Sequence, residues 1–175
     1  LFSCTLDAQD GHSRALTYVT VHGDFCTPMF MPVGTSATVK GLTVPELKEA
    51  GAQVVLANTY HLSQRPGIEV IEQSGGIHSF CGYDGPMLTD SGGYQVFSLA
   101  DTRTVDADGV SFKSIYDGMR IRWSPEDNMA VQEALGADIA MQLDQCVPYP
   151  SSRELVESST DLSIEWARRC LAAHR

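Results

Sequence analysis

The segment 87-MLTDSGGYQVFSLA-100 joins an apolar run to a polar loop. Met87 and Leu88 are typical of a buried strand, and this strand runs directly into Asp90 and Ser91. Two glycines follow, which leave the backbone there without side chains. In parallel α/β folds, ligands bind at the carboxyl ends of the strands. A carboxylate in this position therefore indicates a functional site at the edge of a parallel sheet.

Strand-like and helix-like segments alternate along the rest of the chain. The predicted strands are short and apolar throughout, as in a parallel sheet that helices cover. They span 29–34, 53–58, 86–90 and 137–144, and the predicted helices span 43–52, 66–76, 124–135 and a long segment from Ser151 onward. Thr43 with Glu46, and Ser151 with Glu154, have the spacing of helix-capping residues.

Two further segments do not follow this alternation. Residues 1–28 are predicted to form N-terminal strands, with 15–23 in an opening hairpin or small sheet. An insertion near 100–123 contains a second predicted hairpin, which turns at Asp117 and Gly118. The chain is thus interpreted as a single partial domain, 1–175, with its α/β units in 29–175.

Counting gives four βα units, whereas a closed (β/α)8 TIM-type barrel needs eight strands and typically ~250 residues. The expected fold class is therefore α/β, with this chain supplying roughly the first four units of such a barrel plus the two hairpins. A doubly wound open sheet is the alternative that four units do not exclude.

Composition limits the function classes. The net charge is −10, from 22 acidic and 12 basic residues, which argues against a broad electrostatic surface for nucleic acid or an anionic membrane. Five scattered cysteines without a Cys-x-x-Cys pair favour a reduced, cytoplasmic protein. No apolar run approaches the ~20 residues of a membrane span, so no membrane partner is expected.

A second carboxylate strengthens the prediction of a site. Asp144 ends the strand 137–144 just as Asp90 ends the strand 86–90, and Asn58 ends the strand 53–58. Each of these residue types also occurs in ordinary turns, where the side chain bonds its own backbone. Two acids at the same edge of the sheet favour the functional interpretation.

Six groups of residues then form a specific colinear pattern. They are 30-FMPVGTSATVKGLT-43, 57-ANTYHLSQRPG-67, 87-MLTDSGGYQVFSL-99, 109-GVSFKS-114 with 116-YDG-118, 124-SPE-126 and 137-ADIAMQLDQCVPYP-150. From about residue 10 to its end, the chain resembles the N-terminal half of the tRNA-guanine transglycosylase family, the queuine tRNA-ribosyltransferases, in their bacterial type. The family's fold is a (β/α)8 barrel.

The resemblance implies a base exchange in tRNA. Guanine at the wobble position (34) of the GUN anticodons of tRNAs for Asp, Asn, His and Tyr is exchanged for 7-aminomethyl-7-deazaguanine (preQ1) in queuosine biosynthesis. The exchange is a double displacement through a covalent enzyme-RNA intermediate. The resemblance further implies that the enzyme is a homodimer and that it binds a structural zinc ion. The zinc motif, Cys-x-Cys-x-x-Cys with a later His, does not occur in this chain.

By resemblance, Asp90 is the proton acceptor and general acid-base, and the nucleophilic Asp belongs to the half of the family that this chain lacks. Asp144 is the residue that recognises the base, because one carboxylate can accept both N1–H and the 2-amino N–H of guanine. Cys146 lies beside the base pocket and favours preQ1 over queuine. Gln145 departs from the Glu usual in bacterial relatives.

The remaining candidates surround these two acids. Ser91 and the backbone at Gly92 and Gly93 are expected to contact the flat base closely, and Tyr94 to stack on it. The polar side chains of Asn58 and Gln95 are expected to orient the acids. His61 is interpreted as a structural hydrogen-bonding residue.

Because the chain resembles only the N-terminal half of the family, we expect further properties. We expect the 175-residue chain to be a fragment of the enzyme that is inactive by itself. Two alternatives stay open, a non-catalytic partner subunit of the same family and an archaeal-type transglycosylase that uses preQ0. Retention of both Asp90 and Asp144 argues against the first, and the context of Cys146 argues against the second.

Overall fold

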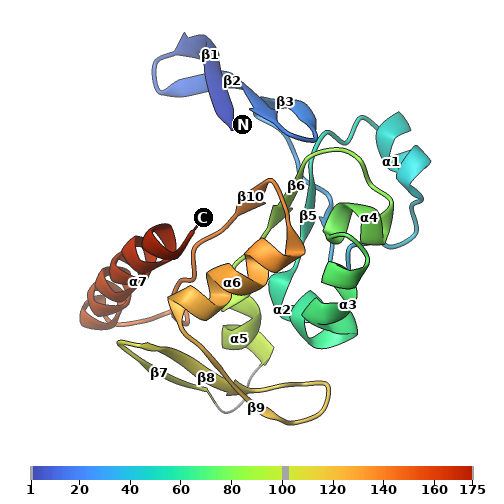
Figure 1. Ribbon diagram of the computed structural model, residues 1–175. Coiled ribbons are helices and arrows are strands. Elements are labelled where there is room, and N and C mark those ends of the chain that lie inside the picture. The colour runs from blue at the N-terminus through green and yellow to red at the C-terminus, as the bar shows by residue number, and fades with distance from the viewer. Residues whose placement is uncertain (1, 100–102, 175) are drawn as a thin grey trace.

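The computed structural model describes residues 2–99 and 103–174 (Figure 1). Its described residues form one parallel and two antiparallel sheets. The central parallel sheet contains β4 (Val33–Gly34), β5 (Val55–Ala57), β6 (Met87–Thr89) and β10 (Ile139–Ala140). The prediction of an α/β chain with a parallel sheet is confirmed, although each strand is shorter than expected.

The order of strands in the central sheet helps to distinguish a (β/α)8 barrel from a doubly wound open sheet. The order is β4-β5-β6-β10, which is also their order along the chain, and all three pairings are parallel. A doubly wound sheet reverses its strand order at a switch point. The observed order is that of consecutive units of a barrel, but the described sheet does not close, so the complete barrel stays a prediction.

Helices follow the strands of the central sheet. They are α1 (Val44–Glu49), α2 (Thr59–Leu62), a π-helical turn (Ser63–Gly67), α3 (Ile68–Gln73), α4 (Ile77–Cys81), α5 (Gly93–Leu99), α6 (Pro125–Leu135) and α7 (Arg153–Ala173). The predicted capping box of Thr43 and Glu46 is confirmed at α1. The predicted cap of α7 is wrong by one residue: the Ser152 hydroxyl accepts the N–H of Leu155, whereas the Ser151 hydroxyl donates to the Pro148 carbonyl.

The predicted helix 66–76 is interrupted. Arg65 is extended, with φ −145° and ψ 118°, because the ring of a following proline disfavours the helical region for the residue before it. A regular helix begins only at Ile68. Gly75 and Gly76 both have positive φ, and they separate α3 from the helix α4 that the sequence pattern did not predict.

Two clusters of buried side chains form the core. The first lies beneath α1, α3 and α4 and includes Leu62, Ile71 and Met87. The second joins the inserted sheet to α7 and contains the aromatic residues Tyr60, Phe112, Trp123 and Trp166. Their burial fixes the loops at the carboxyl ends of β6 and β10 between the two clusters. No described helix has both the length and the apolar character needed to cross a membrane.

Both predicted hairpins prove to be parts of three-stranded antiparallel sheets. The N-terminal sheet contains β1 (Ser3–Asp10), β2 (Ser13–Thr20) and β3 (Gly23–Thr27), and it projects from the rest of the molecule (Figure 1). The inserted sheet contains β7 (Thr104–Asp106), β8 (Gly109–Lys113) and β9 (Arg120–Trp123). The turn at Asp117 and Gly118 is confirmed, and the predicted start of the insertion, residues 100–102, lies outside the described residues. The prediction of N-terminal strands within residues 1–28 is confirmed, whereas the three-residue polar strand β7 lacks the apolar alternation that would have revealed it.

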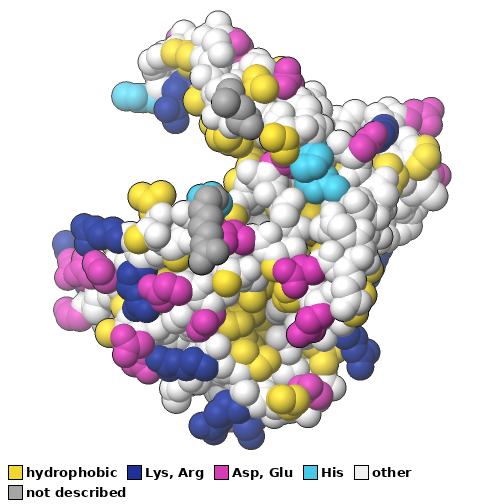
Figure 2. Space-filling view, viewed as in Figure 1, with side chains coloured by type: hydrophobic (Ala, Val, Ile, Leu, Met, Phe, Trp, Pro, Cys, Tyr) yellow, Lys and Arg dark blue, Asp and Glu magenta, His cyan; other side chains and the backbone are white. Residues whose placement is uncertain are grey.

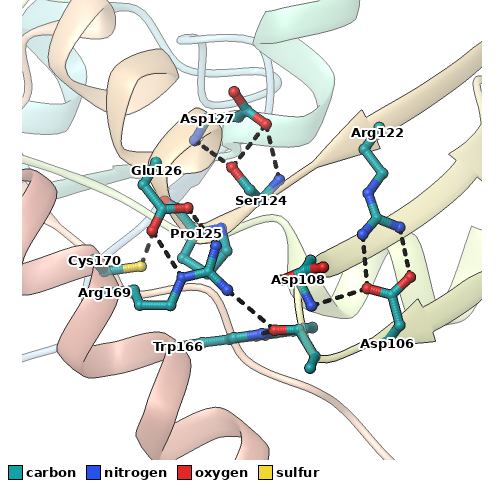
Figure 3. A network of polar contacts seen from close by, with 11 residues as sticks. Asp106, Asp108, Arg122, Ser124, Pro125, Glu126, Asp127, Trp166, Arg169 and Cys170 are labelled. Atoms are coloured by element: carbon teal, nitrogen blue, oxygen red, sulfur yellow. Dashed lines mark hydrogen bonds and ion pairs between the residues drawn. The ribbon is translucent and has the colours of Figure 1, made fainter.

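A polar network fastens the inserted sheet to α6 and α7 (Figure 3). Arg169 makes two hydrogen bonds with the Glu126 carboxylate, of 2.7 and 2.6 Å, and a third of 3.1 Å with the Ala107 carbonyl. The indole N–H of Trp166 donates to the same carbonyl at 2.9 Å. The hydrogen bond from Arg169 lowers the pKa of Glu126 to about 2.

Replacing Arg169 by alanine is expected to lower the free energy of unfolding by about 1 kcal/mol at neutral pH, because three hydrogen bonds are lost. A carboxyl with a lowered folded-state pKa stabilises the fold above its ordinary pKa of 4.5, and this contribution is lost as pH falls toward 2. The deficit of the variant should therefore shrink at about pH 3, as measured by urea unfolding with tryptophan fluorescence.

Arg168→Ala is the matched control, because Arg168 pairs with Glu165 on the exposed surface of α7. Its expected effect is below about 0.5 kcal/mol. Equal deficits for the two variants would show that the network of Arg169 has no special role.

Candidate active site

Asp90 lies directly after β6 and is held by residues that follow β5. Its backbone N–H donates to the Ala57 carbonyl at 3.1 Å, which extends the parallel ladder by one residue. One carboxylate oxygen accepts the backbone N–H of Thr59 at 2.9 Å, and the other accepts N–H groups from Asn58 and, at 3.2 Å, from Gln95. The carboxylate is therefore fixed in orientation by three donors.

Asn58 and Gln95 thus both contact Asp90, as predicted for residues that orient an acid. Gln95 uses its amide N–H for this contact, while its amide oxygen is buried and has no hydrogen-bond partner among the described residues. A buried acceptor without a partner is uncommon in folded proteins.

Asp144 lies in the loop after β10, next to the loop that contains Asp90. Its Oδ1 accepts a hydrogen bond of 3.0 Å from the Ser91 hydroxyl, and its Oδ2 accepts one of 3.4 Å from the Cys146 thiol. The Ser91 hydroxyl also accepts the N–H of Gly93 at 3.1 Å. Ser91, the neighbour of Asp90 in the chain, thus links the loop after β6 to Asp144 in the loop after β10.

The structure gives a reason for glycine at both positions of the loop that the sequence did not reveal. A Cβ on Gly93 would lie 2.5 Å from Oδ1 of Asp144 and 2.8 Å from its carbonyl oxygen. Gly92 has φ +74°, and a Cβ there would lie 3.0 Å from the Trp123 ring and 3.2 Å from Tyr60. The bare backbone is thus needed for contacts within the protein, and the close approach of a base stays a prediction.

Two buried amides support the site and were missed by the sequence reasoning. Gln132 accepts from the hydroxyl of Thr89 and from the N–H of Met141, both at 3.0 Å, and donates to the Met141 carbonyl at 2.7 Å. It also donates to Asn128, whose own amide donates to the Ser91 carbonyl at 2.7 Å. Two amides four residues apart on the buried side of α6 were the available signal.

A pocket opens beside Asp144. It is lined by residues of α5, the inserted sheet, α7 and the loop after β10, among them Gly93, Phe97, Val110, Leu143, Asp144, Cys146 and Trp166. Burial, together with the nearby Asp144 carboxylate, raises the pKa of the Cys146 thiol to about 11. The thiol is therefore protonated at neutral pH and donates its hydrogen to Asp144.

The remaining predicted residues lie at the margin of the site. The Tyr94 side chain, on the first turn of α5, is 64% exposed, so its ring is open to a stacking partner. His61 bonds the Tyr116 hydroxyl at 2.8 Å through Nδ1, which confirms the prediction that it has a structural hydrogen bond. Burial lowers the pKa of His61.

The chain is similar in sequence to proteins of one family. The family model described as queuine tRNA-ribosyltransferase matches residues 9–175. Proteins named queuine tRNA-ribosyltransferase from Gloeobacter violaceus, Thermosynechococcus vestitus and Deinococcus radiodurans are 52%, 51% and 48% identical to this chain over 99%, 98% and 98% of its length.

The same comparisons show how much of such a protein the chain represents. The alignments cover 46%, 46% and 44% of these three relatives, so the chain spans about half the length of the curated relatives it matches. Asp90, Asp144 and the loop between β6 and α5 lie inside the matched region. This chain therefore belongs to the queuine tRNA-ribosyltransferase family.

Proposed function

We propose that the protein containing this chain exchanges guanine for preQ1 at position 34 of tRNAs with GUN anticodons. The observation that carries this proposal is that Asp90 directly follows β6 and that its neighbour Ser91 hydrogen-bonds Asp144, in the loop after the adjacent parallel strand β10. Base exchange requires a carboxyl for proton transfer at the base and a second group that selects the base. The two acids suit these separate tasks because their surroundings differ.

Asp90 is proposed as the general acid-base. A nucleophilic carboxylate from the part of the enzyme beyond this chain bonds C1′ of ribose 34 as the C1′–N9 bond to guanine breaks. The departing base takes its proton from the acid-base, and the incoming base returns one as its own bond to C1′ forms. The three donors around Asp90 fix the direction in which this proton moves.

Asp144 is proposed to recognise the base. A carboxylate oxygen carries two lone pairs, so those of Asp144 can accept from a base while keeping Ser91 and Cys146 as partners. Guanine and preQ1 present two adjacent N–H donors that one carboxylate can accept, whereas adenine does not, so adenine would form fewer hydrogen bonds with Asp144. The small protonated thiol of Cys146 beside Asp144 supports preQ1 rather than the larger queuine as the incoming base.

The exposed ring of Tyr94 is proposed to stack on the exchanged base. The base has to leave the anticodon stack to reach Asp144, and stacking on an aromatic ring offsets part of the cost. Because the chain carries a net charge of −10, most phosphate contacts with the anticodon loop are proposed to come from the other half of the enzyme.

The remaining expectations concern that other half. We propose that it adds the later strands of a (β/α)8 barrel, next to the outer strands β4 and β10 of the sheet, and that the full enzyme is a cytoplasmic homodimer. A family zinc bound by three cysteines and a histidine does not fit the described residues. All five cysteines are free, and the one candidate metal group contains none of them.

A fusion enzyme tests the proposal. In it, this chain replaces the matching 174-residue segment of the Gloeobacter violaceus relative. It is expected to incorporate labelled guanine into tRNA with a GUN anticodon and to release the label when preQ1 is added. A tRNA with adenine in place of the wobble guanine is the control. A folded fusion that binds tRNA without exchange would overturn the proposal in favour of a non-catalytic partner subunit.

The isolated chain should be inactive in the same assay, because it lacks the proposed nucleophile and leaves the barrel interior uncovered. Exchange by the isolated chain at a rate within about ten-fold of the fusion enzyme would contradict this expectation. The measurement uses equal molar amounts of the two proteins and the same labelled guanine.

Replacing Gly93 by alanine is expected to reduce the kcat/KM for guanine at least about 100-fold, since the added Cβ would displace the Asp144 carboxylate. Alanine favours a helix by about 1 kcal/mol over glycine, so a loss of activity would not arise from a weakened α5. Ser98→Ala, at an exposed position of the same helix, is the control. Unchanged kcat/KM in the Gly93 variant would show that Asp144 tolerates displacement.

A further inference from the structure

Asp138 is a third carboxylate, at the opposite end of the sheet from Asp90 and Asp144. It lies immediately before β10, and its side chain is only 1% exposed. Its Oδ2 accepts the N–H of Met87, the first residue of β6, at 2.9 Å. A site here is therefore at the amino ends of the parallel strands, away from the proposed chemistry.

Two histidines face this carboxylate. Nδ1 of His22 lies 2.8 Å from Oδ1 of Asp138, and Nε2 of His78 lies 3.2 Å from Oδ2. His22 belongs to the turn between β2 and β3, whereas His78 belongs to α4. Figure 2 shows histidine side chains where the projecting N-terminal sheet meets the rest of the molecule. The three residues thus join three separate elements of the chain.

A carboxylate this deeply buried needs a compensating positive charge. Among residues 2–99 and 103–174, no lysine or arginine forms an ion pair with Asp138, and its ionic partners are the two imidazoles. Besides the hydrogen bond from the Met87 N–H, the groups that could offset its charge are a proton on a histidine and a metal ion bound to all three side chains.

The donor atoms suit a metal ion. One ligand atom from each of His22, His78 and Asp138 can be chosen so that all lie within 4.8 Å of one another. Two imidazole nitrogens and one carboxylate oxygen favour zinc and its neighbours in the first transition series over magnesium or calcium, which prefer oxygen.

The two rings differ in their freedom to adjust. They are stacked, with centroids 3.5 Å apart and an angle of 14° between their planes, so one ring must tilt before both nitrogens point at one ion. The His78 side chain is 12% exposed, and the His22 side chain, in a surface turn, is 33% exposed. His22 is therefore the ligand that can tilt, and its side of the site is open to the entry of an ion and of a water ligand.

We propose that His22, His78 and Asp138 bind one divalent metal ion, preferentially Zn²⁺. The ion would fasten the turn between β2 and β3 to α4 and to the start of β10, and so fix the N-terminal sheet on the rest of the molecule. This site differs from the family zinc in both ligands and position, since it contains no cysteine.

Metal content of the fusion enzyme tests the proposal. After chelator treatment and dialysis against buffered Zn²⁺, the enzyme with the native His22 is expected to hold about one zinc ion more than His22→Ala. His12→Ala is the matched control, because His12 occupies the exposed turn between β1 and β2. Any zinc bound by cysteines elsewhere in the fusion is common to all three proteins and cancels in the comparison.

Cobalt(II) provides a second readout. Cobalt bound by thiolates gives a charge-transfer absorption that a site of two histidines and a carboxylate lacks, so the two kinds of site can be distinguished. Asp138→Asn is a further variant of similar volume, and its amide oxygen can still accept the Met87 N–H. Zn²⁺ should raise the unfolding temperature of the native enzyme and of His12→Ala, but by less in His22→Ala and Asp138→Asn.

Equal metal content in the native enzyme, His22→Ala and Asp138→Asn would overturn the proposal. If these proteins also differed in how their unfolding temperatures depend on pH, the compensating charge would be a shared proton and not a metal ion. Retained guanine exchange by His22→Ala would show that the variant is folded, because His22 lies outside the proposed catalytic and base-binding residues.

Discussion

Replacing Asp90 by alanine in the fusion enzyme is expected to lower the rate of guanine exchange by on the order of 10³-fold, the range of general acid-base catalysis. The carboxylate is held by donors from Asn58, Thr59 and Gln95, and alanine leaves these donors facing a site without an acceptor. The loss should appear mainly in kcat, since Asp90 moves a proton in the transition state. Single-turnover exchange of labelled guanine measures this directly.

Asp84→Ala is the matched control for this experiment, because Asp84 is an exposed carboxylate that pairs with Lys48. Its exchange rate should equal that of the unsubstituted enzyme. A loss for Asp90→Ala that appeared entirely as a higher KM, with kcat unchanged, would show that Asp90 binds the base and does not transfer a proton.

Replacing Asp144 by alanine is expected to reduce the kcat/KM for guanine by on the order of 10³-fold, because two hydrogen bonds to the base are lost. The affinity for tRNA as a whole should change far less, since phosphate contacts supply most of it. Comparing the Asp144 variant with Asp161→Ala, at an exposed position of α7, separates base recognition from the loss of a charge.

Asp144→Asn sharpens this test. An amide presents one acceptor and one donor, so one of the two N–H groups of guanine would face another N–H group. The asparagine variant should therefore bind guanine no better than the alanine variant. Full activity of either variant would refute the assignment of base recognition to Asp144.

Much of the fold followed from local patterns in the sequence. Short apolar runs separated by helical periods predicted parallel strands, and Thr43 with Glu46 predicted the start of α1, because both patterns depend on neighbouring residues. Strand lengths and the break at Arg65 were predicted less well. They depend on which hydrogen bonds the tertiary structure completes and on the proline that follows Arg65.

The candidate site was likewise predicted only in part. The position of Asp90 at the end of a strand was predicted correctly, because parallel strands bring their carboxyl ends to one edge. The prediction that Asp144 ends the strand 137–144 was wrong, since β10 stops at Ala140 and Asp144 lies in the loop that follows. The support of the site by Asn128 and Gln132 could not be predicted, since helical spacing does not reveal which distant carbonyls a buried amide reaches. The glycine at position 93 was predicted to admit a base, whereas in the structure it accommodates Asp144.

The sequence by itself determined the alternation of elements, the acid Asp90 at the end of a strand and the family to which the chain belongs. Only the tertiary structure decided which of these residues touch one another. His22 and Asp138 are 116 positions apart and still lie within 2.8 Å. Local periodicity reports whether a side chain is buried, but contacts between distant side chains depend on how the two sheets and α4 pack together.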